Sequence, residues 1–128
     1  MSGADRFRGS ARRVEKPWGW ELVWAETELY VGKLLRIDAG HALSLQYHEV
    51  KDEAWLVQEG RALLELGLVG EPLETIEIGP GDTFHYAPGT VHRITAIEDT
   101  LVLEVSTPHL SDVVRLEDAY GREGTSAP

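Results

Sequence analysis

Two histidines, a glutamate and a glutamine stand at spacings that suit a single metal ion. Gln46 and His48 lie two residues apart in an apolar segment, and Glu53 follows His48 by five residues. Side chains two apart on a strand point to the same face, and a turn after His48 would bring Glu53 back beside it. His92 begins a later apolar segment, directly after a Pro-Gly turn signal. We predict that a barrel closes these four groups around one ion.

The types of these four residues restrict the metal and its chemistry. The chain has no cysteine, so a thiolate site is excluded. Two imidazoles, a carboxylate and an amide oxygen suit Zn²⁺, Mn²⁺, Fe²⁺, Co²⁺ or Ni²⁺, and we expect one divalent ion, with zinc ahead of the others. The neutral Gln46 leaves more positive charge on the ion, which favours Lewis-acid chemistry over oxygen activation. We interpret His41 and His109 as ordinary polar residues.

The elements that must position these groups are strands. Short segments rich in Val, Ile, Leu, Tyr and Trp recur, separated by Gly, Pro and Asp turn signals. They cover residues 20–25, 28–37, 42–48, 53–58, 61–69, 73–78, 82–87, 91–96 and 100–106. This pattern predicts an all-β sandwich or barrel in one domain of residues 14–122, between flexible segments at 1–13 and 123–128. Ser111 resembles a helix N-cap, so we expect one or two helical turns after it.

The charge distribution limits the classes of partner that the protein can bind. The net charge is −10, made up of +3 on residues 1–13 and −13 on the remainder. Such a body repels nucleic acid, so we predict no nucleic-acid partner. No apolar run approaches the roughly 18 residues that a membrane helix needs, so we expect no membrane contact and a cytoplasmic location. An anionic substrate would need local positive charge, for which the candidates are Lys33, Lys51, Arg93 and Arg115.

Several segments resemble a known family. GHALSLQYHEVKDEAWLVQEG (40–60) and GDTFHYAPGTVH (81–92) are similar to the two cupin motifs, with Gln46 in the place of the first histidine. KPWGWE (16–21), SLQYH (44–48) and VVRLEDAYGR (113–122) resemble the cupin domain of type II phosphomannose isomerases. The resemblance implies a jelly-roll barrel that interconverts mannose 6-phosphate and fructose 6-phosphate through an enediolate. Lys51 and Ala54 depart from that pattern, which has arginine and histidine there.

The resemblance and the strand pattern also suggest roles for the charged residues. Lys51 corresponds to the family's arginine and is a catalytic or phosphate-binding candidate, against the alternative of a solvated lysine in a turn. Arg115 is a candidate phosphate clamp with a possible catalytic role. Lys33 shares the strand parity of the apolar residues 35 and 37, which predicts an inward-facing, substrate-binding lysine. His85 is a candidate base, although we favour an outward-facing strand residue. The base itself is not identified.

Apolar residues outside the site suggest packing and assembly. Trp18, Trp20 and Trp55 are interpreted as core residues in preference to platforms that stack on a sugar. Apolar side chains also occupy the face of the metal strand away from the ion, namely Leu43, Leu45 and Tyr47. Either the N-terminal strands or a second subunit must cover them, and we predict a homodimer.

Two other functions remain open at this point. The same scaffold suits a metal-dependent oxygenase or lyase acting on a small acid. A sugar-binding module that retains the metal without catalysis is the other alternative, because of the departures at Lys51 and Ala54. Iron content with oxygen uptake marks the first alternative, and ligand binding without turnover marks the second.

Overall fold

The computed structural model describes residues 3–123, which form eleven strands and one short 3₁₀ helix. The helix is η1 (Gly3–Phe7), and no helix in the described part of the chain is long and apolar enough to cross a membrane. The strands are β1 (Arg12–Lys16), β2 (Gly19–Glu26), β3 (Val31–Ile37), β4 (Leu45–Tyr47), β5 (Glu53–Glu59), β6 (Ala62–Leu68), β7 (Glu74–Ile78), β8 (Thr83–Tyr86), β9 (Thr90–Ala96), β10 (Thr100–Ser106) and β11 (Val114–Glu117).

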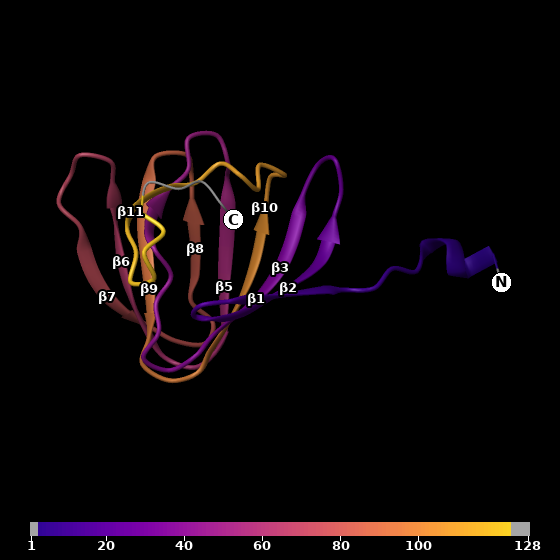
Figure 1. The fold of residues 1–128 in the computed structure, drawn as a ribbon, viewed down its shortest axis with the longest axis horizontal. Helices are drawn as coiled ribbons and strands as arrows, with labels where there is room; N and C mark the ends of the chain where they lie inside the picture. The colour runs from indigo at the N-terminus through magenta and orange to yellow at the C-terminus, as the bar shows by residue number, and fades with distance from the viewer. Residues whose placement is uncertain (1–2, 124–128) are drawn as a thin grey trace.

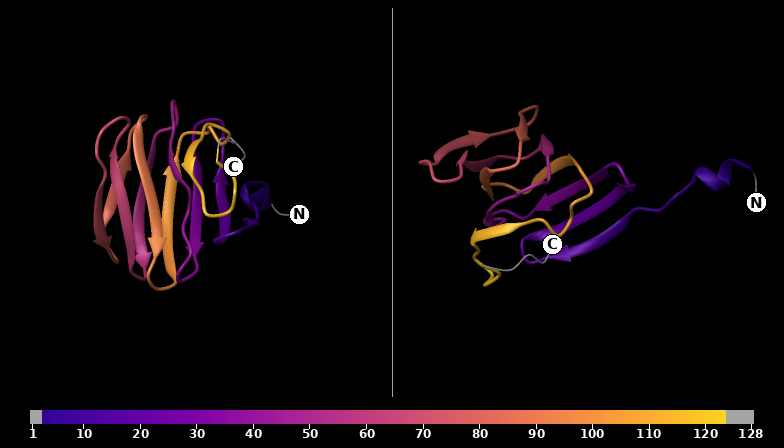
Figure 2. Two further views of the ribbon diagram at one scale, coloured as in Figure 1. Left: turned by 60° about the vertical axis from the view of Figure 1, so that its left-hand side comes forward. Right: turned by 90° about the horizontal axis from the view of Figure 1, so that it is seen from above.

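The strands build two antiparallel sheets that face each other (Figures 1 and 2). One sheet has the order β1-β2-β3-β10-β5-β8 and the other has the order β11-β4-β9-β6-β7. Neighbours in the sheets are often distant in sequence, as where β10 pairs with both β3 and β5. The prediction of an all-β barrel of the jelly-roll kind is therefore confirmed.

The core lies between the two sheets and follows from strand alternation. In β5 the side chains of Glu53, Trp55 and Val57 are buried, whereas the residues between them are more exposed. Successive side chains on a strand point to opposite faces, so one face of each sheet supplies the core. Trp18 and Trp55 belong to this core, as predicted, and Trp20 is half-buried beneath the guanidinium of Arg13.

The predicted helical turn after Ser111 is wrong, because this segment forms strand β11. Val114 pairs with Tyr47 and Arg115 pairs with Gln46, so β11 extends the edge of the second sheet beside β4. The β-branched residues Val113 and Val114 favour an extended backbone, and pairing with β4 supplies hydrogen bonds that a short isolated helix lacks. The N-cap signal at Ser111 reflects only a local preference and carries no information about pairing with β4.

The N-terminal segment leaves the body of the protein and carries the helix η1, in which no residue is buried (Figure 1). Strand β1 already begins at Arg12, so the last two residues of the segment expected to be flexible belong to the first sheet. Of the expected C-terminal tail 123–128, residues 124–128 lie outside the described part of the chain.

The face of β4 that we expected to need a partner is covered within the chain. Leu45 is buried, and Leu43 packs against the core. Tyr47, the third residue of this face, is half-buried. The homodimer stays a prediction, and this face no longer argues for it.

The turn between β5 and β6 requires a glycine at position 60. Its φ is +92°, and a Cβ there would lie 2.3 Å from the carbonyl oxygen of Asp99. Gly40 has a similar φ of +82° but no atom within 4 Å of its Cβ position. Gly40→Ala should therefore cost only the left-handed backbone penalty of about 1 kcal/mol, whereas Gly60→Ala should cost distinctly more. Urea denaturation of both variants measures this, and equal losses would contradict the turn geometry.

Candidate metal centre and pocket

Three buried ligand-type residues meet between the two sheets. His48 follows β4 and His92 lies in β9, so both belong to the second sheet, where Gln46 pairs directly with His92. Glu53 is the first residue of β5 in the opposite sheet, and its register partners are Tyr86 and Ser106. The structure thus brings together three of the four residues predicted as metal ligands, from both sides of the barrel.

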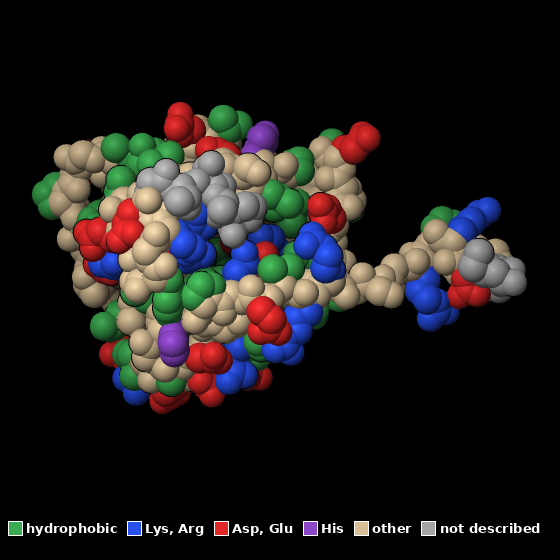
Figure 3. Space-filling model, in the orientation of Figure 1, with side chains coloured by type: hydrophobic (Ala, Val, Ile, Leu, Met, Phe, Trp, Pro, Cys, Tyr) green, Lys and Arg blue, Asp and Glu red, His purple; other side chains and the backbone are tan. Residues whose placement is uncertain are grey.

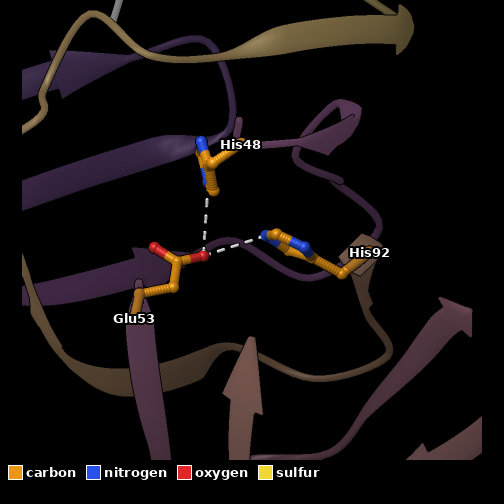
Figure 4. A group of neighbouring side chains, drawn as sticks. All are labelled: His48, Glu53 and His92. Atoms are coloured by element: carbon orange, nitrogen blue, oxygen red, sulfur yellow. Dashed lines mark ion pairs between the residues drawn. The ribbon is translucent and has the colours of Figure 1, made fainter. Parts of the chain in front are cut away.

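The three side chains point toward one another (Figure 4). His48 Nε2 lies 3.4 Å from Glu53 Oε1, and His92 Nε2 lies 3.0 Å from the same oxygen. The ligands of a tetrahedral ion, each about 2.0–2.1 Å from the metal, are about 3.3 Å from one another. The observed separations match that spacing. The candidate ligand atoms of these three residues all lie within 4.8 Å of one another.

The hydrogen bonds of the two imidazoles use their Nδ1 atoms and leave their Nε2 atoms to face Glu53 without a cation between them. Nδ1 of His92 donates to the backbone carbonyl of Thr90 at 3.0 Å, and Nδ1 of His48 donates to the carbonyl of Asp112. An imidazole that carries its one proton on Nδ1 presents a lone pair at Nε2. Both Nε2 atoms and Glu53 Oε1 are buried without a hydrogen-bond partner. Three convergent electron pairs without a donor repel one another unless a cation lies between them, so these residues fit a metal ion.

Packing fixes the plane of His92. The Tyr86 ring stacks on it with centroids 4.1 Å apart and an interplanar angle of 3°. Trp55 meets the same imidazole edge-on at 5.7 Å. With its Nδ1 held by Thr90 and its ring held by two aromatic groups, His92 has one orientation available, which is the preorganisation that a metal ligand requires.

The charge of Glu53 is maintained against its burial. Burial alone would raise the pKa of its carboxyl group, but hydrogen bonds from His48 and His92, which the rings can donate through Nε2 only in their protonated form, and the charge of Lys51 hold the pKa well below its usual range. Lys51 Nζ lies 3.1 Å from Glu53 Oε2 and 3.5 Å from Glu104 Oε2. Burial tends to lower the pKa of Lys51, but Glu104 and Glu53 raise it overall. Glu53 is therefore an anion, as a metal ligand must be.

Gln46, the predicted fourth ligand, lies beside the cluster of His48, Glu53 and His92. It lines the same pocket as His48, and its Oε1 accepts a hydrogen bond of 2.7 Å from Ser44 Oγ. An amide oxygen has two lone pairs, so one remains for a metal. Its coordination of an ion stays a prediction.

A pocket opens beside His48 and concentrates positive charge. Its charged lining comprises five basic and two acidic residues, namely Lys16, Lys33, Lys51, Arg115, Arg122, Glu21 and Glu104. Blue Lys and Arg side chains surround this hollow in the space-filling view (Figure 3). In a chain with a net charge of −10, this local excess of cations stands out, and it favours an anionic ligand.

Three of the four cations named as candidates for an anionic substrate reach the pocket, whereas Arg93, which pairs with Glu65 and Glu117, and His85 do not. Lys33, Lys51 and Arg115 line it, and each is buried, with Lys33 facing inward as its strand parity predicted. His85 pairs with Ala54 on the outer face of the first sheet, where its exposed ring contacts Asp52 at 3.0 Å. The structure gives no support to a catalytic role for His85, because the parity of β8 turns it away from the pocket.

Sequence reasoning missed four residues that the structure places at the site: Lys16, Glu104, Asp112 and Arg122. Glu104 had a usable signal, because it shares the parity of the buried Val102 and Ser106 on β10. Lys16 shares the parity of the half-buried Val14 on the short strand β1, whereas Asp112 and Arg122 lie outside the strands, where no periodicity applies.

Asp112 organises the loop after the first metal strand. Its carboxylate accepts backbone hydrogen bonds from Glu49, Val50 and Lys51, at 3.1, 2.7 and 2.7 Å. Its carbonyl also accepts a hydrogen bond from His48. One residue of the closing segment, residues 110–122, therefore positions both a candidate metal ligand and Lys51. This double contact joins the segment that precedes β11 to the site.

Comparisons with known proteins agree with this geometry. The mannose-1-phosphate guanylyltransferase ManC of Salmonella typhimurium is 36% identical over 116 residues, which are 87% of this chain and 23% of ManC. The KdgF structure from Halomonas is 26% identical, with a TM-score of 0.63 over 79% of this chain and 89% of KdgF. A CapF structure is 17% identical, with a TM-score of 0.73 over 92% of this chain and 37% of CapF, and it shows the fold alone.

The curated relatives are much longer proteins, since the chain spans about a quarter of their length. Their sequence similarity agrees with the resemblance to the cupin domain of type II phosphomannose isomerases. The cupin domain model matches residues 33–107, which contain all four candidate ligands. Fold, ligand cluster and family model agree, and the chain belongs to the cupin family.

Proposed function

We propose that this chain is a metal-dependent sugar-phosphate isomerase that interconverts mannose 6-phosphate and fructose 6-phosphate. The observation that carries the proposal is the position of His48, which belongs to the ligand cluster and also lines the cation-rich pocket. A ligand bound there would reach a metal ion and positive charge at the same time. The 36% identity to ManC supports a sugar-phosphate substrate, and the substrate itself is part of the proposal.

The residues around the pocket can supply the proton transfer that aldose–ketose interconversion requires. A bound ion, held by His48, Glu53, His92 and Gln46, would supply Lewis acidity that favours negative charge on the substrate oxygens. Lys51 is held as an ammonium group between two carboxylates, so it can donate a hydrogen bond but cannot abstract a proton. The base must therefore be another group that lines the pocket.

Glu104 is our candidate for this base. It lines the pocket, its Oε1 accepts from Trp55 Nε1 at 3.1 Å, and its buried Oε2 lies 3.5 Å from Lys51 Nζ as an ion pair, without a closer hydrogen bond. Glu21, the other carboxylate of the lining, is engaged by Lys33 at 3.2 Å. Trp55 thus orients one oxygen of Glu104 and leaves the other available to a substrate proton. In this proposal Lys51 and Arg115 bind the substrate, and His85 has no role.

The size of the pocket favours one alternative function. The cavity measures about 70 Å³, whereas ligand pockets typically measure roughly 300–1,000 Å³. A metal-dependent oxygenase or lyase acting on a small acid would fit this space directly. The isomerase proposal requires the segment 110–122, which contributes Leu110, Val113 and Arg122 to the lining, to move outward when a hexose phosphate binds. Oxygen uptake by the iron-loaded protein with small acids, and none with sugar phosphates, would favour the alternative.

The metal site makes the first prediction of the proposal. Purified protein should carry about one divalent ion per chain, and His48→Ala, His92→Ala and Glu53→Gln should each lose it, because each removes one of the converging lone pairs. His85→Ala is the matched control and should retain the ion, since that ring lies on the outer face. Elemental analysis after dialysis, with circular dichroism to verify folding, gives the answer. Unchanged metal in all three site variants would disprove the assignment.

The isomerase reaction makes the second prediction. In D₂O, the metal-loaded protein should interconvert mannose 6-phosphate and fructose 6-phosphate and incorporate deuterium at C1 of the ketose and C2 of the aldose, because an enediolate route moves the proton between these carbons through an exchangeable base. Chelation should stop both events. Nuclear magnetic resonance follows conversion and exchange together. If the metal-loaded protein binds hexose phosphates but shows neither, the sugar-binding module replaces the isomerase.

Glu104→Gln provides a sharper prediction about the base. The variant should retain the metal but lose turnover by about 10²-fold or more, since general base catalysis typically contributes 10²–10⁴-fold. The KM should change little, because the amide preserves the shape of the side chain. Steady-state kinetics with metal analysis separates this result from that of Glu53→Gln, which should lose the ion itself. Wild-type turnover in Glu104→Gln would assign the base elsewhere.

A further inference from the structure

The outward side of the first sheet carries an apolar row where an antiparallel sheet usually presents polar side chains to water. The strand registers align one leucine each from β2, β3, β10 and β5, namely Leu22, Leu34, Leu103 and Leu56. The chain neighbours of Leu34 and Leu103 within their strands are buried, so the row points away from the core. Val105 lies beside the row and is 51% exposed.

Trp24 extends this row toward the N-terminal edge of the sheet. The register of β2 against β3 shifts between Val23 and Ala25, which places Trp24 in a bulge. A Cβ on Gly32 would lie 2.6 Å from the Trp24 ring, so the indole lies over β3 and still has 53% of its surface exposed. Large exposed apolar patches mark interaction sites, and tryptophan is enriched at their centres. The four leucines, Val105 and Trp24 are called the apolar face below.

The segment 3–11, called the arm below, has little contact with its own barrel (Figures 1 and 3). No residue of η1 is buried, and Phe7 is 79% exposed with the guanidinium of Arg6 over its ring. Ordering an exposed segment costs conformational entropy, which only packing against another surface can offset. The arm therefore requires a surface that its own barrel does not provide.

A groove of about 520 Å³ lies between the base of the arm and β2. Residues 9–12 form one wall, and residues 23–26, including Trp24, form the other. Strand β1 pairs with β2 only from Arg12 and Val23 onward, so within the described part of the chain residues 24–26 have no strand neighbour on that side. Such an edge can accept an extended segment of another chain through backbone hydrogen bonds.

Charge indicates that the missing partner is a second copy of this chain. Residues 1–13 carry +3 and the remainder carries −13, so the arm of one copy is complementary to the body of another. Phe7 stands between two arginines, Arg6 and Arg8, whereas the groove is lined by the exposed Glu26. An arm placed on a partner's body therefore reduces the repulsion between two acidic chains.

The area of the apolar face also indicates that the arm takes part. Four strands about 4.8 Å apart and about five residues long cover roughly 300 Å², so two such faces bury roughly 600 Å². Stable interfaces bury about 1,200–2,000 Å² in total. The apolar face alone is too small, and two exchanged arms would supply the difference.

We propose that a second copy of this chain covers the apolar face and that each protomer places its arm in the groove of the other. Phe7 of one protomer then packs beside Trp24 of the partner subunit. The contact is the same from both sides, as a two-fold dimer requires. The inference does not depend on the proposed isomerase function, because neither the metal cluster nor the cation-rich pocket takes part.

Sedimentation velocity of the full chain measures the dimer Kd. The wild type should be dimeric at micromolar concentration. Leu56→Lys puts a charge into the apolar face and Phe7→Ser removes the apolar anchor of the arm, so each should raise the dimer Kd about tenfold or more. Leu63→Lys is the matched control and should stay within about twofold, because Leu63 is 39% exposed on the second sheet, against 38% for Leu56. Circular dichroism verifies folding, and Phe7 lies outside the barrel.

Disulfide formation locates the arm, since the chain has no cysteine of its own. Protomers with Arg8→Cys are mixed with protomers with Ala25→Cys, and a covalent heterodimer should form because these positions follow Phe7 and Trp24. A mixture of Arg8→Cys with Leu63→Cys should give none.

A wild type that stays monomeric at micromolar concentration would overturn the proposal. A dimer whose Kd is unchanged in both Leu56→Lys and Phe7→Ser would also overturn it, because the contact would then use another face. Absence of the heterodimer disulfide in a dimeric mixture would contradict the exchange of arms.

Discussion

The convergence of two imidazole nitrogens and one carboxylate oxygen is the constraint on which the site depends. The carbonyls of Thr90 and Asp112 accept hydrogen bonds from Nδ1 of His92 and His48. Neither ring can therefore donate a second proton to Glu53 through Nε2 without becoming charged. Buried electron pairs of this kind are costly without a positive partner. The barrel holds them in place by aromatic packing around His92 and by opposing strands, and a divalent ion explains the arrangement with no further assumption.

The closing segment connects this centre to the rest of the pocket. Asp112 positions His48 and the backbone of Lys51, Arg115 pairs beside Gln46, and Arg122 reaches the lining from beyond β11. Basic residues of the pocket therefore lie on the same strand and loop that orient a candidate ligand. Movement of this segment to admit a hexose phosphate would couple substrate entry to the geometry of the metal site.

Strand periodicity made much of this structure predictable from sequence. The two-residue spacing of Gln46 and His48 and the inward parity of Lys33 are local properties that a pleated strand preserves. The strand β11 was missed because its partner, β4, is about seventy residues away, and the N-cap signal at Ser111 describes only a local preference. Lys16 and Arg122 were missed for a related reason, since only the folded barrel brings residues from the two ends of the domain into one pocket.

The central claim is that His48, Glu53 and His92 bind one divalent ion directly. X-ray absorption spectroscopy of the zinc-loaded protein measures the first coordination shell. We predict two imidazole nitrogens at about 2.0–2.1 Å with oxygen ligands at about 2.0–2.2 Å, and no zinc retained by a His48→Ala, His92→Ala double variant. A shell of oxygens alone, or an unchanged spectrum in the double variant, would contradict this account.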